Sequence, residues 1–345
     1  MKSDDEFNIR RAYLSRIAKM GGALVMSGAV AEETSEDAPL DFGFIRQPPG
    51  ELYSIGTHRL HYYCQGEHSQ ARHSDDKHSN DKRSNDKHSE SEGEVTVLFE
   101  PGLGGSALEW TPVVDTIKEK VRACLYDRAG YAWSDPGSNP RHVVKLAQEA
   151  RQLFAKLQAD SKFILVGHSY GGLIMRQLAS TMPDNIVGMI LVDASHEDQF
   201  SRLAGESDVS MLPTSEHFVV AAPELPSGLR EDIRRKILAF SRMRKTYAAL
   251  HAEIASFRDS CNYIKQNRKT FDFPVIIISR GLDPYAKDTA SGNKNRIWHE
   301  LQSDFLTLSA DAEQVIAENS GHHIHIDEPE LIVDAIVKLV ASRGK

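Results

Sequence analysis

Short apolar runs alternate with amphipathic stretches along most of this chain. The apolar runs are four to six residues long and lie at residues 95–99, 123–126, 163–166, 187–192, 275–279 and 314–317. Stretches with the helical spacing of apolar residues separate them, for example at 142–157, 172–182 and 329–341. Fully apolar strands that alternate with helices are typical of a parallel sheet buried on both faces. The pattern therefore predicts an α/β fold with a mostly parallel sheet.

One long interval between the apolar runs carries helical patterning and no convincing strand. It spans about 80 residues between Asp193 and Val275, with helical spacing at 230–243 and 247–265. Ligands of open α/β sheets bind at the carboxyl ends of the strands, and an insertion at this point can cover that edge. We therefore predict that residues 194–272 form a helical cap. The core then consists of residues 39–193 and 273–345.

The segment before these alternating strands and helices contains two predicted edge strands and a low-complexity insertion. Residues 52–64 are rich in aromatic and β-branched residues around a turn at Gly56, which predicts two antiparallel edge strands. Residues 66–94 contain the tandem motifs HSDDK, HSNDK and RSNDK and almost no apolar side chain. Such a segment cannot bury enough surface to offset its ordering entropy, so we predict that it is disordered. Its histidines are read as part of a solvated repeat rather than as a metal site.

Residues 1–38 have the composition of a leader followed by an acidic linker. Arg10 and Arg11 precede a weakly apolar stretch that starts at Met20, and residues 29–31 give an A-x-A cleavage pattern. This arrangement resembles a bacterial twin-arginine export signal. We predict export by such a signal, with a cytoplasmic location as the alternative.

Charge and hydropathy narrow the range of partners. The formal net charge of −8 offers no basic surface, which argues against nucleic acid and against an anionic membrane. No apolar run approaches the roughly 20 residues that cross a bilayer, so no stable membrane span is predicted. A small-molecule ligand fits this chain better, and we expect a monomer or a weak homodimer.

The three cysteines are Cys64, Cys124 and Cys261. An odd number at wide spacings supports neither a disulfide framework nor a metal knuckle. We therefore predict that all three are small buried hydrophobic residues.

The strongest chemical signal is the sequence FILVGHSYGG at residues 163–172. It reads as a strand that enters a G-x-S-x-G turn and continues into a helix. In such a turn the serine is exposed at the sheet edge, because small neighbours let the flanking backbone approach closely. Ser169 is thus the candidate nucleophile. The backbone N–H of Tyr170, at the start of the helix, is a candidate donor to an oxyanion.

A glycine-rich loop follows the first long apolar strand. Residues 99–106 read FEPGLGGS, and the glycines allow the backbone to turn towards the serine. The second oxyanion donor is predicted to be the Leu103 N–H. A phosphate-binding loop is the competing interpretation, but G-x-G-x-x-G is not met and no Gly-Lys-Ser/Thr follows.

A histidine-rich segment lies between the last apolar run and the final helix. Residues 320–329 read SGHHIHIDEP, and His322 is the candidate general base. His323 and His325 are predicted to be packing or surface residues. No cluster of acidic residues or cysteines at ligand spacing completes a metal site, so no metal is predicted.

These motifs together resemble the α/β-hydrolase superfamily, in its esterase, epoxide-hydrolase and dehalogenase-like branch. The resemblance rests on PGLGG, YDRAGYAWS at 126–134, GHSYGG, LVD at 191–193 and SGHHIHIDEP. It runs from about residue 50 to the C-terminus and implies an eight-stranded, mostly parallel sheet with a helical cap. Two departures stand out. Residues 100–102 read Glu-Pro-Gly where His-Gly is usual. The candidate nucleophile is serine rather than the aspartate on which dehalogenases and epoxide hydrolases form an ester.

The acid that partners the histidine has two candidates. In similar proteins it follows either the strand that ends here at Asp193 or the strand that ends near Ser279, which offers Asp283. Either carboxylate lies on the same rim of the sheet and is able to orient the imidazole. The sequence leaves the two alternatives open.

The expected chemistry is acyl transfer to water without a cofactor. A carboxylic ester of a small molecule is the preferred substrate class, with an amide or a lactone next. The alternatives are a non-hydrolytic lyase that uses the same residues and a ligand-binding protein that keeps the fold without turnover.

Overall fold

The computed structural model describes residues 42–66, 95–157, 162–203, 225–284 and 293–342. The predicted leader, and all but the first residue of the predicted disordered insertion, lie outside the described residues. Among the residues described, no helix is both long and apolar enough to cross a membrane.

The core is one eight-stranded sheet with the strand order β1-β2-β4-β3-β5-β6-β7-β8. β1 and β2 are antiparallel around the Gly56 turn, β2 is antiparallel to β4, and all other neighbours are parallel. The predicted fold class is therefore confirmed. The strands are β1 (Glu51–Ser54), β2 (Arg59–Gln65), β3 (Val95–Glu100), β4 (Arg122–Tyr126), β5 (Lys162–His168), β6 (Ile186–Val192), β7 (Val275–Arg280) and β8 (Ala312–Ala317).

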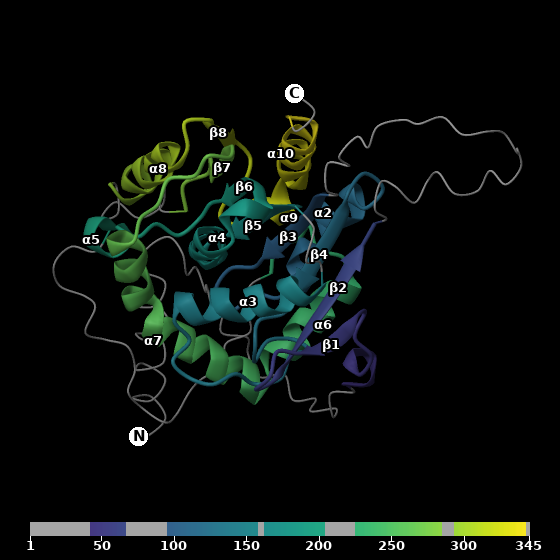
Figure 1. Ribbon diagram of the computed structural model, residues 1–345. Coiled ribbons are helices and arrows are strands. Elements are labelled where there is room, and N and C mark those ends of the chain that lie inside the picture. The colour runs from purple at the N-terminus through teal and green to yellow at the C-terminus, as the bar shows by residue number, and fades with distance from the viewer. Residues whose placement is uncertain (1–41, 67–94, 158–161, 204–224, 285–292, 343–345) are drawn as a thin grey trace, which may run out of the picture.

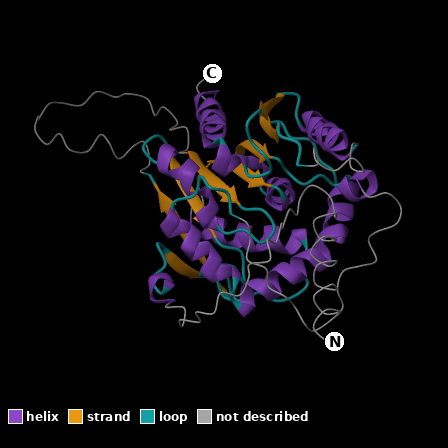
Figure 2. Ribbon diagram, turned by 180° about the vertical axis from the view of Figure 1, so that it is seen from behind, coloured by secondary structure: helices purple, strands orange, loops and turns teal. Residues whose placement is uncertain are grey.

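Helices cover both faces of this sheet (Figures 1 and 2). On β5, Leu165 faces the side of α3 and α4, while Ile164 and Val166 face the side of α2 and α10. Successive side chains of a strand point to opposite faces, so a strand buried on both sides is apolar throughout. The helices are α2 (Thr111–Ile117), α3 (Val143–Leu157), α4 (Tyr170–Thr181), α5 (Gln199–Leu203), α6 (Glu231–Ser241), α7 (Arg244–Gln266), α8 (Lys294–Asp304), α9 (Ile324–Asp327) and α10 (Pro329–Ala341). The described residues also form the 3-10 turns η1 (Phe42–Ile45), η3 (Ala107–Trp110), η4 (Pro183–Asn185) and η6 (Phe305–Leu308).

The described residues between β6 and β7 form helices and no named strand, as the sequence predicts. The two predicted helical stretches correspond to α6 and α7. Helix α7 packs against α3 and α4. It also contacts the loop after β3, because a Cβ added to Gly104 would lie 3.4 Å from the Leu250 side chain. The assignment of residues 194–272 as a cap stays a prediction.

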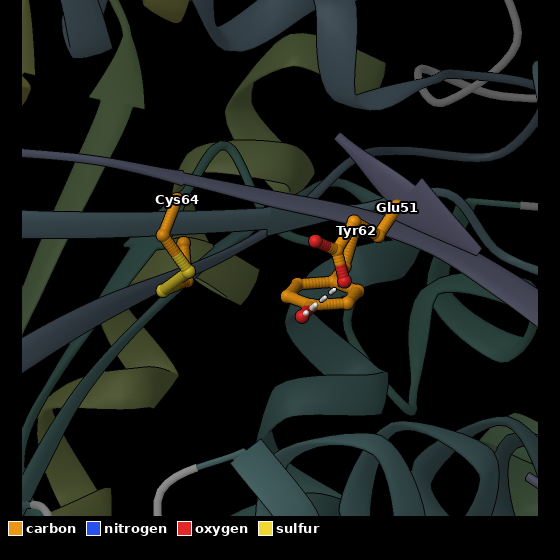
Figure 3. Close-up of a disulfide and its surroundings, with 4 residues drawn as sticks. Glu51, Tyr62 and Cys64 are labelled. Atoms are coloured by element: carbon orange, nitrogen blue, oxygen red, sulfur yellow. Dashed lines mark hydrogen bonds between the residues drawn. A yellow bond between two sulfur atoms is a disulfide. The ribbon is translucent and has the colours of Figure 1, made fainter. Parts of the chain in front are cut away.

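Two of the three cysteines form a disulfide, so the prediction of three isolated hydrophobic residues was wrong for them. Cys64 on β2 faces Cys124 on β4 in the antiparallel register, with their Cα atoms 4.1 Å apart. Figure 3 shows this bond on the strand face that also carries Tyr62, whose hydroxyl contacts the Glu51 carboxylate. The sequence hides the pair because 60 positions separate the two residues. Cys261 is free and buried, as predicted.

The disulfide closes a long loop that contains the whole predicted insertion. A cross-link of this sequence separation restricts the unfolded chain and is expected to contribute about 4 kcal/mol in the chain-entropy account. We expect the Cys64→Ala/Cys124→Ala variant to unfold at a clearly lower urea concentration than the oxidised wild type. Adding reductant should lower the wild-type midpoint and leave the variant unchanged. Equal midpoints for both proteins would contradict the disulfide. Disulfides persist in oxidising compartments, which the predicted export would provide.

Candidate active site

Ser169 lies on a strained turn between β5 and α4. Its φ of 51° and ψ of −122° belong to a region that residues with a side chain rarely adopt. The turn is held at the sheet edge, because the Ser169 N–H donates to the Val192 carbonyl at 3.1 Å. Small neighbours are required here. A Cβ on Gly167 would lie 2.7 Å from the Gly171 oxygen, and one on Gly171 would lie 2.5 Å from the Glu100 oxygen.

The glycine-rich loop after β3 lies against this turn. A Cβ added to Gly102 would be 3.2 Å from the Cβ of Ser169, so the loop backbone is in direct reach of the serine. The Leu103 N–H donates to no acceptor among the described residues. The Tyr170 N–H begins α4, where the first N–H groups have no partner within the helix. Both predicted oxyanion donors are therefore available at the edge that carries Ser169.

His322 lies in the loop between β8 and α9 and is hydrogen-bonded to Asp193. Its Nδ1 is 2.6 Å from Oδ2 of Asp193, and its side chain is 11% exposed while that of Asp193 is fully buried. With the carboxylate ionised, this bond places the imidazole proton on Nδ1 and leaves Nε2 as the basic nitrogen. His168, next to the serine, fixes the same loop, because its Nε2 donates to the His322 carbonyl at 2.8 Å.

Asp193 follows β6 and receives donors from two further elements. The Trp298 indole N–H of α8 donates to Oδ1 at 2.7 Å, and the Arg280 guanidinium at the end of β7 donates to Oδ2 at 3.2 Å. Burial opposes ionisation of Asp193. The Arg280 charge and the hydrogen bond to His322 outweigh that effect and hold the pKa of Asp193 at about 2. The Asp193 carboxylate is therefore charged near neutral pH.

Asp283 lies in a different setting. It is exposed in the loop after β7, and the residues that follow at 285–292 are outside the described chain. Of the two candidate acids, Asp193 is the one bonded to the His322 imidazole.

Comparison with known proteins identifies the family. The sequence model of the alpha/beta hydrolase fold matches residues 95–329, about two thirds of the chain. The chain belongs to the α/β-hydrolase family. An uncharacterized protein, YqjL, from Bacillus subtilis is 26% identical to this hydrolase over 243 residues, which cover 70% of this chain and 82% of that protein.

Solved structures have the same fold at low sequence identity. An epoxide hydrolase, CorEH, aligns with a TM-score of 0.57 at 14% identity and covers 85% of this hydrolase and 98% of its own chain. A thermophilic esterase from Thermogutta terrifontis aligns with a TM-score of 0.52 at 18% identity. The alignment covers 86% of this chain and 96% of the esterase chain. At these identities the likeness shows the fold alone.

His323 and His325 of this α/β hydrolase pack near His322, together with His168 at the end of β5. The ring of His168 lies 4.6 Å from that of His322 and 4.4 Å from that of His325, between centroids. Burial lowers the pKa of both His323 and His325 to about 3, so both rings are neutral near pH 7. Within the described chain, no group of three or more His, Cys, Asp or Glu residues has the geometry to hold a metal ion.

Sequence reasoning missed the residues that hold Asp193. Arg280 is fully buried, and its guanidinium lies 4.7 Å from the Trp298 ring. One signal was available: Arg280 ends a strand that begins with four apolar residues, and a charge at that place requires a buried partner. Trp298 gave no such signal, because an aromatic residue on an amphipathic helix is ordinary.

Proposed function

We propose that this hydrolase cleaves a carboxylic ester of a small molecule through an acyl-enzyme. Ser169 is the nucleophile, His322 the general base and Asp193 the acid that orients it. The proposal rests on one observation above all, the hydrogen bond from His322 to a fully buried Asp193, in a loop that is tied to the residue next to Ser169. The loops after β3, β5, β6 and β8 all lie at the carboxyl edge of the sheet, where this fold places its chemistry.

The reaction follows from the proton and charge positions. Ser169 Oγ attacks the ester carbonyl while His322 Nε2 takes its proton, and Asp193 stabilises the imidazolium that forms. The oxygen of the tetrahedral intermediate carries a negative charge, which the N–H groups of Leu103 and Tyr170 stabilise. His322 then returns the proton to the leaving alcohol. Water, activated by the same histidine, releases the acid and restores Ser169.

The residue type at position 169 favours one of the two reactions, epoxide opening and acyl transfer, that proteins of this fold carry out. An epoxide hydrolase and an esterase both align with this chain, so the fold alone favours neither. Epoxide opening requires a carboxylate nucleophile that forms an ester with the substrate carbon. Serine at position 169 supports acyl transfer instead. An ester is the preferred substrate over an amide, because an alkoxide leaves with less help from a general acid than an amide nitrogen does. A lactone has the same leaving group as an open-chain ester and stands as an alternative substrate.

Labelling with a fluorophosphonate, followed by intact mass, tests this function. We expect one adduct on the wild type and none on Ser169→Ala. Ser195→Ala is the matched control, because its hydroxyl is buried nearby and has no hydrogen-bond partner in the described chain. That variant should keep the adduct. A folded wild type that takes no label would reject the proposal and favour a ligand-binding protein.

A further inference from the structure

Arg128 lies buried beneath the glycine-rich loop and uses every donor of its guanidinium. The side chain offers five N–H groups in a fixed plane. Two bind the loop itself: Nη1 donates to the Pro101 carbonyl at 2.9 Å, and Nη2 donates to the Gly102 carbonyl at 2.8 Å. The other three bind carboxylates, at 2.6 Å to Glu100 and at 2.9 and 3.0 Å to the two oxygens of Glu253.

The bond to Gly102 bears directly on the oxyanion donor. The Gly102 carbonyl and the Leu103 N–H belong to one peptide group, which is planar and trans, so the two point in opposite directions. Fixing the carbonyl on Arg128 therefore fixes the direction of the Leu103 N–H. A cation on the carbonyl also polarises the peptide and strengthens its N–H as a donor.

Two glutamates, Glu253 and Glu100, bind the Arg128 guanidinium. Glu253 on α7 binds it through both oxygens and also accepts the Tyr131 hydroxyl at 2.9 Å. Glu100, at the end of β3, binds the Arg128 guanidinium and also accepts a hydrogen bond from the Tyr126 hydroxyl. The Glu-Pro-Gly sequence at residues 100–102, which departs from the family pattern, thus places a carboxylate against a buried arginine. All three ionisable side chains of the cluster are buried, and burial raises the pKa of Glu100 to about 7.

We propose that Arg128 is a positioning residue that aims the Leu103 N–H at the oxyanion, and that Glu253 makes this alignment depend on helix α7. The inference rests on the proposed function, since it assigns no new reaction. It means that helix α7, which lies between β6 and β7 in the chain, affects the rate of the reaction at Ser169. The helix does so through Glu253 and Arg128, neither of which touches the reacting atoms.

Arg128→Lys is the primary test. Lysine keeps one positive charge between the two carboxylates but has three donors in place of a planar fork, so it cannot hold both carbonyls and both carboxylates. Loss of a full oxyanion donor lowers kcat by about 10²–10³, and misalignment should give a smaller effect, about tenfold or more. With p-nitrophenyl acetate we expect this loss in kcat and a KM within about twofold of wild type.

A transition-state analogue separates positioning from general damage. A trifluoromethyl ketone forms a hemiketal oxyanion on the serine, so its inhibition constant should rise by the same factor as kcat/KM falls. Arg176→Lys is the matched control. It replaces another buried arginine bound through two nitrogens to a carboxylate, Glu197, with no contact to the loop. That variant should keep the wild-type affinity for the ketone.

Glu253→Gln provides a second, milder variant. It replaces the carboxylate that binds Arg128 by a neutral amide and leaves the contacts of Arg128 with the loop in place. We therefore expect kcat to fall less than in Arg128→Lys, with KM again unchanged. If Arg128→Lys does not fold, Glu253→Gln alone decides. Unchanged kcat and ketone affinity in the folded variants would overturn the inference. A wild type that takes no fluorophosphonate label would instead reject the proposed function, so the two failures are distinguishable.

Discussion

Replacement of Ser169 by alanine is expected to lower kcat by about 10⁶ if the serine, histidine and acid act as one unit. The hydroxyl is the only group that forms the acyl-enzyme in the proposed reaction. The remaining activity would come from the oxyanion donors and from binding, which act without the nucleophile. Steady-state hydrolysis of an activated ester, with substrate depletion followed over hours, measures this loss.

The alanine variant should keep the fold of the wild type. The positive φ at position 169 costs alanine about as much as serine, because the strain arises from the Cβ that both residues share. Thermal unfolding should therefore change little, and a low rate will report lost chemistry. A variant that retains more than about 1% of the wild-type kcat would remove Ser169 from the mechanism.

Replacement of Asp193 by asparagine is expected to lower kcat by about 10⁴. The amide would present a donor or a neutral oxygen to His322 Nδ1, so the imidazole proton would no longer be held there and Nε2 would lose its role as base. Asp283→Asn is the matched comparison, with a kcat close to wild type, because Asp283 is exposed while the His322 bond goes to Asp193. The opposite order of the two losses would assign the acid to Asp283.

Asp193→Asn is also expected to lower the thermal stability of the protein by an amount that depends on pH. Asp193 has its pKa lowered from 3.8 to about 2. Since the folded state holds the charged form more tightly, this contribution to stability is complete above the unfolded pKa and is lost as the pH falls through about 2. Asp193→Asn should therefore unfold at a lower temperature than the wild type at pH 7, and the difference should shrink below pH 3.

Local patterns were enough to predict the fold and to select two candidate site residues. The apolar runs at 163–166 and 187–192 matched β5 and β6 because a strand buried on both faces is mostly apolar. Ser169 was identifiable because its turn needs glycines at fixed offsets, which are written in the sequence. His322 was identifiable because it follows the last strand and precedes the last helix, an order that the chain itself displays.

The tertiary structure alone decided the contacts between distant segments. Cys64 meets Cys124 only through the antiparallel register of β2 and β4, which no spacing along the chain reveals. Asp193 bonds His322 across 129 positions, and Arg128 bonds Glu253 across 125. Such pairs depend on which strands are neighbours and how a helix packs over them. The sequence by itself therefore determined the order of elements and the turn that carries Ser169, because both are set by neighbouring residues. The partner of His322 and the contacts of Arg128 with the loop after β3 required the assembled sheet, because these residues approach one another only after the strands have paired.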